Sequence, residues 1–291
     1  MTMKIIVQFS GGKDSQACLI WAVKKYGKDK VTAVFCDTGW EHEITYKHID
    51  NVCKNLGVKL IILRNNKYKD FVDMSIKKTR FPSSTRRFCT SELKIIPMVD
   101  YILSQDESFI IIQGIRSSES ARRAKLEVEC SYFKEYFSED EKNLYHKKAV
   151  KEWYKAHDAS VLRPIFKWSS QDVIDYILEN GQQPNPLYKR GFSRVGCFPC
   201  IMCRKREIQL ISKDEWAKRR LINAEQRMKE ETKRGSSFFP PNYIPKRFCA
   251  NGIFPTVREV FKYVNRNDVE ADMFEPDEGY SCMSLYHGLC E

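Results

Sequence analysis

The residues best suited to chemistry lie near the start of the chain, between an apolar run and a stretch with helical spacing. The segment consists of Ser10, Gly11, Gly12, Lys13, Asp14 and Ser15. Two glycines let a backbone turn sharply toward an anion, and the first amides of a helix lack intrahelical partners. The helix dipole attracts negative charge, and Lys13 adds a cation. We therefore predict a phosphate-binding loop; an ordinary glycine-rich turn is the alternative.

Polar residues also follow two later apolar runs. Asp37-Thr38 comes after Val31–Cys36, and Gly114-Ile115-Arg116 comes after Phe109–Gln113. Asp37 could bind magnesium or a ribose hydroxyl, or cap a turn, whereas an arginine fork binds two phosphate or sulfate oxygens at once. We predict catalytic roles for Lys13, Asp37 and Arg116. The predicted nucleotide contacts are Ser10, Gly11, Gly12, Lys13, Asp14, Ser15, Asp37, Thr38, Gly114 and Arg116.

The cysteines offer a second kind of chemistry. The chain has 11 cysteines, an odd number, and no export signal, which favours reduced thiols or a metal site over disulfides. Because thiolates need a soft cation, the candidates are an iron–sulfur cluster and structural zinc. The predicted ligands are Cys197, Cys200, Cys282 and Cys290, with Cys203 and then Cys89 as rivals for the fourth position. Unligated, reduced cysteines remain the alternative.

Short β-branched runs alternate with amphipathic stretches in the first half of the chain. The predicted strands are Lys4–Phe9, Val31–Cys36, Val58–Leu63, Phe109–Gln113 and Val161–Phe166. The predicted helices are Asp14–Tyr26, Glu41–Leu56, Phe71–Lys78, Ser91–Leu103 and Ser169–Glu179. Strands separated by helices predict an α/β fold with a doubly wound, parallel, five-stranded sheet. Ligands bind such sheets at the carboxyl ends of the strands, where the polar residues above lie.

The character of the sequence changes after Gly181, where prolines and glycines precede the cysteine cluster. A long basic helix is predicted over Lys213–Arg234, and the tail from Gly235 is rich in proline, glycine and aromatic residues. We therefore predict two regions. Residues 1–181 form a nucleotide-binding domain, and residues 182–291 form a helical, cysteine-rich, basic appendage.

The composition indicates a globular protein with a basic surface. Hydrophobic residues make up 42% of the 291 residues, and the formal net charge is +11. No run is long enough to span a membrane, so we expect a soluble, cytoplasmic protein. The charge favours polyanionic partners, and basic residues gather in Lys77–Lys94 and Arg204–Arg234. These stretches predict either nucleic-acid contact or solvated helix faces.

With its strand–loop–helix context, the segment Ser10–Ser15 resembles the PP-loop family, the adenine nucleotide alpha hydrolases. The pattern GxxxxGK[ST] of the other common phosphate loop does not occur. The resemblance implies ATP binding and cleavage between the α- and β-phosphates, in which an acceptor is adenylated and pyrophosphate leaves. Lys13 and the loop amides would stabilise the leaving pyrophosphate with the help of magnesium.

Later segments resemble the phosphoadenosine phosphosulfate (PAPS) reductase branch of that family, over about residues 3–205. They are Arg87-Phe88-Cys89-Thr90, Leu93-Lys94, Asn185-Pro186-Leu187-Tyr188 and Val195-Gly196-Cys197-Phe198-Pro199-Cys200. The resemblance implies a [4Fe–4S] cluster in preference to zinc, although the adjacent cysteine pair usual in the family is absent at Cys89-Thr90.

Two departures from that branch decide the predicted reaction. The phosphate loop is intact, whereas it is degenerate in reductases that act on PAPS, and the tail His287–Glu291 lacks their Glu-Cys-Gly-x-His segment. We predict an ATP pyrophosphatase that adenylates an acceptor for sulfur transfer to a nucleic acid or small molecule, with a sulfur-donor protein as partner. The alternatives are a PAPS or adenylylsulfate reductase, and a non-catalytic nucleotide- or nucleic-acid-binding module of a defence or mobile-element system.

Overall fold

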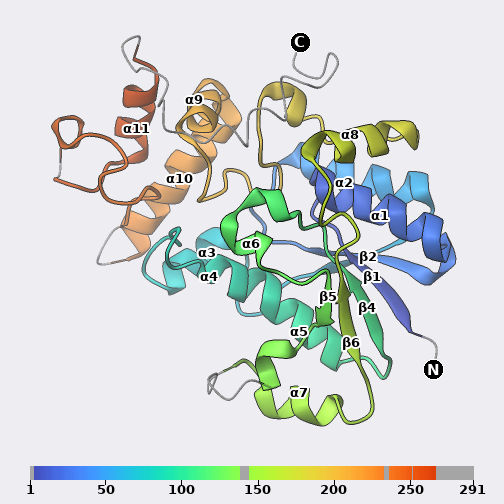
Figure 1. Cartoon of the computed structure of the whole chain (residues 1–291). Coiled ribbons are helices and arrows are strands. Elements are labelled where there is room, and N and C mark those ends of the chain that lie inside the picture. The colour runs from blue at the N-terminus through green and yellow to red at the C-terminus, as the bar shows by residue number, and fades with distance from the viewer. Residues whose placement is uncertain (1–2, 138–143, 233–235, 251, 267–291) are drawn as a thin grey trace.

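The computed structural model describes residues 3–137, 144–232, 236–250 and 252–266, and a six-stranded sheet forms its centre (Figure 1). The strands are β1 Lys4–Gln8, β2 Val31–Cys36, β3 Lys59–Leu63, β4 Phe109–Ile112, β5 Glu129–Ser131 and β6 Ala159–Leu162. Their order is β3-β2-β1-β4-β6-β5. The first five in this order are parallel, which confirms the predicted parallel sheet, whereas β5 pairs antiparallel with β6 at the edge. The prediction missed β5 because three residues are too few to show an alternating pattern.

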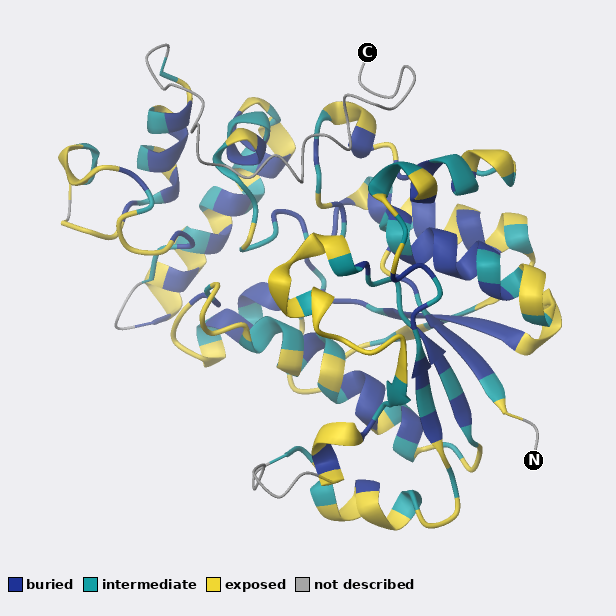
Figure 2. Cartoon of the chain, in the orientation of Figure 1, coloured by how far each residue is buried: buried dark blue, intermediate teal, exposed yellow. Residues whose placement is uncertain are grey.

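Helices cover both faces of the sheet, so the predicted doubly wound α/β architecture is confirmed (Figure 1). One face carries α1 Lys13–Tyr26, α2 Glu43–Leu56 and α8 Ser170–Glu179, and the other carries α5 Ile96–Leu103 and α7 Lys147–Trp153. Alternate residues of β1 serve the two layers, since Ile5 and Val7 pack toward α1 while Ile6 packs toward α5. Figure 2 shows the central strands β1, β2 and β4 as mostly buried between these layers, whereas the edge strands β3 and β5 are partly exposed.

The remaining helices lie around the carboxyl edge of the sheet and in the C-terminal region. They are α3 Phe71–Lys77, α4 Phe88–Thr90, α6 Ala121–Ala124, α9 Lys205–Lys213, α10 Glu215–Glu231 and α11 Val257–Val264. Short 3-10 turns span Lys28–Lys30, Ser117–Glu119, Lys134–Phe137, Tyr188–Arg190 and Lys246–Phe248, and a π turn spans Ser91–Ile95.

The long basic helix predicted over Lys213–Arg234 is confirmed as α10 Glu215–Glu231, and residues 233–235 lie outside the described residues. Asp214 separates α10 from α9 because it has an extended backbone and its carboxylate accepts a hydrogen bond from Ala217 N at 3.0 Å. A new N-cap therefore starts α10 one residue after α9 ends.

A third hydrophobic core joins the two predicted regions of the chain. Trp40 and Phe71 from the first region pack in one buried cluster with Phe198, Leu221 and Phe261 from the second. The predicted boundary near residue 181 therefore has a continuous apolar interface across it. Within the described ranges, every helix is too short or too polar to cross a membrane.

Candidate functional site

The predicted phosphate loop connects β1 to α1, and close packing fixes its backbone. Gly11 has a φ of 77°, and a Cβ on it would lie 2.8 Å from Cγ2 of Thr45. Asn185 Nδ2 donates a hydrogen bond to Gly11 O at 3.2 Å. Glycine is therefore required at position 11 both by its left-handed backbone and by the absence of space.

Gly114 holds the loop from the neighbouring strand. It follows β4, and a Cβ on it would lie 2.6 Å from Ser15 N and 2.7 Å from the carbonyl carbon of Asp14. The backbone after β4 thus contacts the first turn of α1 directly. Any side chain here would push the two segments apart.

Hydrogen bonds close the loop on itself and onto a distant tyrosine. Ser10 N donates to Ser15 Oγ at 3.2 Å, and Ser15 Oγ donates to Gly12 O at 2.9 Å. Lys13 N donates to the hydroxyl oxygen of the buried Tyr188 at 3.1 Å. These bonds set the loop shape within the protein itself.

Asp14 joins the two predicted catalytic cations. Its Oδ2 accepts from Lys13 Nζ at 2.9 Å, and its Oδ1 accepts from Arg116 Nε at 2.6 Å. Burial alone would raise the pKa of Asp14, but the Lys13 and Arg116 charges beside it lower that pKa below its ordinary value. Asp14 is therefore an ionised carboxylate that orients Lys13 and Arg116 at one edge of the sheet.

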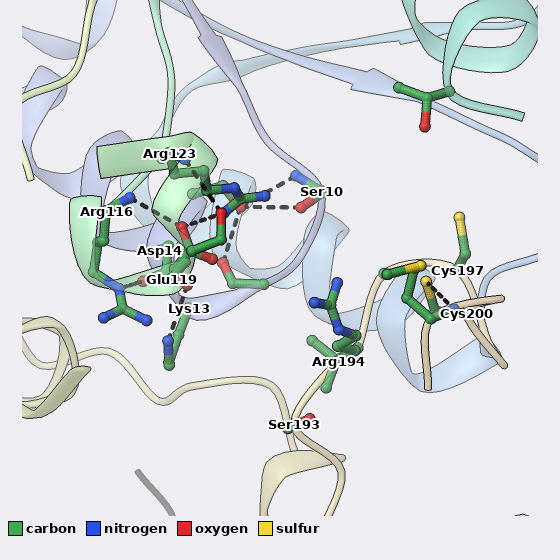
Figure 3. Close-up of a pocket in the computed structure, with 18 of the residues that line it drawn as sticks. Ser10, Lys13, Asp14, Arg116, Glu119, Arg123, Ser193, Arg194, Cys197 and Cys200 are labelled. Atoms are coloured by element: carbon green, nitrogen blue, oxygen red, sulfur yellow. Dashed lines mark hydrogen bonds and ion pairs between the residues drawn. The ribbon is translucent and has the colours of Figure 1, made fainter. Parts of the chain in front are cut away.

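The loop opens into a cavity of about 960 Å³ that also reaches the cysteine segment (Figure 3). Ten predicted residues line it, namely Ser10, Gly12, Lys13, Asp14, Ser15, Thr38, Gly114, Arg116, Cys197 and Cys200. Gly11 lies behind the loop against Thr45. The structure thus brings together residues that are almost 190 positions apart in the sequence.

Asp37 does not line the cavity. Its Oδ1 accepts from the Tyr46 hydroxyl at 2.6 Å and from Gly39 N at 2.8 Å, and its Oδ2 accepts from Arg64 Nε at 2.8 Å. Burial raises the pKa of Asp37, but these hydrogen bonds and the Arg64 charge lower it overall. In this structure Asp37 stabilises the turn after β2 through these hydrogen bonds. Its role as a magnesium or ribose ligand stays a prediction.

At the far end of the cavity, Cys197 contacts the turn after β2. Its Sγ lies 3.7 Å from Thr38 Oγ1 and 3.8 Å from Glu41 Oε1, and Thr38 Oγ1 donates to Glu41 Oε1 at 2.7 Å. Burial raises the pKa of Cys197 to about 12, and burial also raises the pKa of Glu41. The Coulombic interaction with Cys197, followed by that with Glu41, raises the pKa of Lys94.

The described residues do not by themselves assemble the predicted metal site. Within the described residues, no three His, Cys, Asp or Glu side chains gather as a metal site requires. Cys203 does not line the cavity, and Cys282 and Cys290 lie outside the described residues. The described cysteines alone thus do not fit a [4Fe–4S] cluster or zinc, and the four-cysteine site stays a prediction that depends on the tail.

Magnesium also lacks a dedicated set of protein ligands. The carboxylates that line the cavity are Asp14 and Glu119, and both are paired with cations, the second with Arg123. Such a site suits magnesium that arrives already bound to the phosphates of a nucleotide.

Several cavity residues have no role in the sequence-based prediction. Lys167, Ser193 and Arg194 line the cavity, and Tyr188 accepts the hydrogen bond from Lys13 N. Tyr188 belongs to a segment that carried the family resemblance, which was a signal for its importance. The others follow no periodic or spacing rule, so only the folded chain places them here.

Comparisons with known proteins identify the family of the chain. The sequence model of the phosphoadenosine phosphosulfate reductase domain matches residues 4–203. An uncharacterized 37.8 kDa protein of Escherichia phage 186 is 30% identical, and the alignment covers 98% of this chain and 96% of that protein. An uncharacterized protein of Methanocaldococcus jannaschii is 33% identical over 72% of this chain and 38% of its own length.

Among solved structures, the phosphoadenylyl-sulfate reductase of Candida auris, in a phosphate complex, aligns with a TM-score of 0.48 and 16% identity. That alignment covers 69% of this chain and 84% of the other. The family match spans more than half of the chain and includes the phosphate loop, Arg116 and the segment Cys197–Cys203. The chain therefore belongs to the phosphoadenosine phosphosulfate reductase domain family, an enzyme family of the PP-loop superfamily.

Proposed function

We propose that this protein is an ATP pyrophosphatase that adenylates an acceptor and so activates it for sulfur transfer. An acceptor oxygen forms a bond to the α-phosphorus of ATP, and the bond from that phosphorus to the bridging oxygen breaks. Pyrophosphate leaves with the electron pair of that bond. The observation that carries the proposal is the complete phosphate loop, in which Asp14 holds Lys13 and Arg116 at the anion-binding edge.

Lys13, Arg116 and the first amides of α1 would stabilise the charge that builds up on the leaving pyrophosphate. Preorganised donors of this kind contribute about 10²- to 10³-fold to a rate. Asp14 keeps both cations in place without the help of a ligand. Magnesium bound to the ATP phosphates would supply further charge neutralisation.

The thiols at the other end of the cavity support sulfur chemistry after adenylation. Cys89, Cys197 and Cys200 line the same cavity as the phosphate loop. A sulfur atom delivered there, by a donor protein or a small thiol, would meet an adenylated acceptor without leaving the site.

Sulfonucleotide reduction is the second candidate, and the family description together with these thiols favours it. The two candidates differ in the nucleotide they need. A pyrophosphatase requires the β- and γ-phosphates, whereas a reductase requires a sulfonucleotide and releases sulfite.

Calorimetric titration of anaerobically purified protein with Mg-ATP, and separately with PAPS, tests the proposal. We expect preference for Mg-ATP, and we expect Lys13→Ala to lower pyrophosphate release by about 100-fold or more. Lys30→Ala is the matched control, because Lys30 is exposed and lies in the 3-10 turn Lys28–Lys30, away from the cavity. Preference for PAPS with sulfite release would replace the proposal with the reductase, and full ATP turnover in Lys13→Ala would exclude the assigned role of the loop.

A further inference from the structure

Apart from Lys94, which interacts with Cys197, and Arg204, the N-cap residue of α9, the cations that line the cavity fall into two groups. Near the loop, Lys13 and Arg116 pair with Asp14, and Arg123 pairs with Glu119. In the second group, the side chains of Arg87, Lys167 and Arg194 line the same cavity without a hydrogen bond or ion pair to any described residue. Every cation of the first group is paired with a carboxylate, three positive charges against two negative ones, whereas the second group has no paired carboxylate and its positive charge is available to a ligand.

The three unpaired cations come from distant parts of the chain. Arg87 belongs to the basic stretch Lys77–Lys94 and precedes α4, Lys167 follows β6, and Arg194 precedes the cysteine segment. All three residues are exposed, as expected for cations at the rim of a cavity. Three like charges without counter-charges around one cavity give it a positive potential, which would attract an anionic ligand.

Arg194 is held at the rim by a buried carboxylate. Glu207 Oε1 accepts from Ser193 N at 2.9 Å, Ser193 Oγ at 3.0 Å and Arg194 N at 3.2 Å, and its Oε2 accepts from Arg204 N at 3.0 Å. Glu207 is only 2% exposed. In Figure 3, Arg194 lies between the phosphate loop and Cys197 and Cys200, where an acceptor would have to pass.

We propose that the acceptor is a single-stranded nucleic acid whose backbone phosphates bind Arg87, Lys167 and Arg194. This inference rests on the proposed adenylation. Repeating phosphates match several separate cations better than one compact anion does, and proteins bind single strands through such electrostatic rims. A cavity of about 960 Å³ holds a nucleotide and one extruded acceptor group but not a duplex, so the reacting residue must be unpaired.

Fluorescence anisotropy with labelled RNA and DNA strands of about 20 nucleotides tests the proposal, at about 50 to 200 mM salt and without ATP. Three phosphate contacts predict a slope of log affinity against log salt of about −2 for single strands. Arg87→Gln, Lys167→Gln and Arg194→Gln should each weaken binding about fivefold and reduce the slope by about 0.7. Lys30→Gln, which removes one positive charge away from the cavity, should leave both quantities unchanged.

The outcomes separate this inference from the proposed function. No binding to either strand, tighter binding to a duplex of the same sequence, or equal weakening by Lys30→Gln would overturn the nucleic-acid acceptor. The relative affinities for RNA and DNA identify which strand is bound. Pyrophosphate release without strand binding would also overturn the acceptor while leaving the pyrophosphatase intact. Strand binding with the expected cation effects but no pyrophosphate release would instead overturn the proposed function.

Discussion

The two ends of the cavity differ in how their charged side chains are paired. At the phosphate-loop end, Asp14 pairs with Lys13 and Arg116, and hydrogen bonds fix the backbone. At the cysteine end, Cys197 Sγ lies 3.8 Å from Glu41 Oε1, and the guanidinium of Arg194 at the rim has no hydrogen bond or ion pair to a described residue. The two ends therefore differ in how far their cations are paired with protein groups before a ligand binds.

This difference indicates separate tasks for the two ends. A preorganised anion site stabilises charge without having to rearrange during a reaction, which suits the leaving group of a phosphoryl transfer. An end with unbalanced cations gains most from a ligand that brings its own negative charge. The loop end therefore suits the nucleotide, and the cysteine end suits a second, anionic substrate.

The largest expected effect comes from the contact that locks the loop. Gly114→Ala would place a Cβ 2.6 Å from Ser15 N, so the loop must move away from β4. We expect a loss of about 3 kcal/mol in the free energy of unfolding, measured by urea denaturation, together with loss of Mg-ATP binding. Gly196→Ala is the stability control, because a Cβ there meets no atom within 4 Å. Equal stability of the two variants would show that the loop end is less rigid than the comparison requires.

Lowering the pH should reduce the free energy of unfolding through His48, which packs against α1 behind the phosphate loop. The buried His48 Nε2 lies 3.1 Å from Oε1 of Gln16 in α1, and burial lowers the pKa of His48 from 6.5 to about 4. Between these values the unfolded chain binds a proton that the folded protein does not, so stability falls as pH decreases from about 6.5 toward 4. The loss reaches about 3 kcal/mol at the low end.

Urea unfolding at a series of pH values measures this loss. His48→Gln should remove that part of the pH dependence, whereas His157→Gln should keep it. A pH dependence that is unchanged in His48→Gln would contradict the assignment to His48.

A smaller effect should appear at the cysteine end. Glu207→Gln keeps the side-chain size but replaces one acceptor oxygen with an NH₂ group, which would face a backbone N–H. We expect a loss of about 2 kcal/mol in thermal or urea unfolding, since a buried donor is left without an acceptor. The exposed Glu230→Gln on α10 is the control and should change stability by less than about 0.5 kcal/mol. If the two variants matched, Glu207 would not be what holds Arg194 at the rim.

The smallest expected effect tests the link between the two ends. Tyr188→Phe removes the hydroxyl that accepts from Lys13 N, and we expect a loss of about 1 kcal/mol in stability. Mg-ATP affinity should fall with it, because the loop amide then lacks its fixed partner. Tyr26→Phe serves as the comparison, since Tyr26 lies at the last residue of α1 and away from the loop. Higher Mg-ATP affinity in Tyr188→Phe would mean that Tyr188 competes with phosphate for the Lys13 amide.

Much of the fold could be predicted because its signals are local. The runs at Val31–Cys36 and Phe109–Ile112 are continuous and β-branched, as expected for strands buried on both faces. The missed β5 shows the limit of such signals, because a three-residue edge strand has no pattern of its own.

The sequence by itself determined the phosphate loop, because two glycines, a lysine and a strand–helix context act within a few residues. Only the tertiary structure decided the rest of the site. It directs Asp37 toward Tyr46 and Arg64 instead of the cavity, and it places Arg194 in the cavity that the loop lines. The phosphate loop is formed by residues that are neighbours in the chain, so its residue types and spacing are visible in the sequence. The charge balance of the cavity depends on side chains that are far apart in the chain and close in the fold. No spacing in the sequence indicates which of these side chains lie close together.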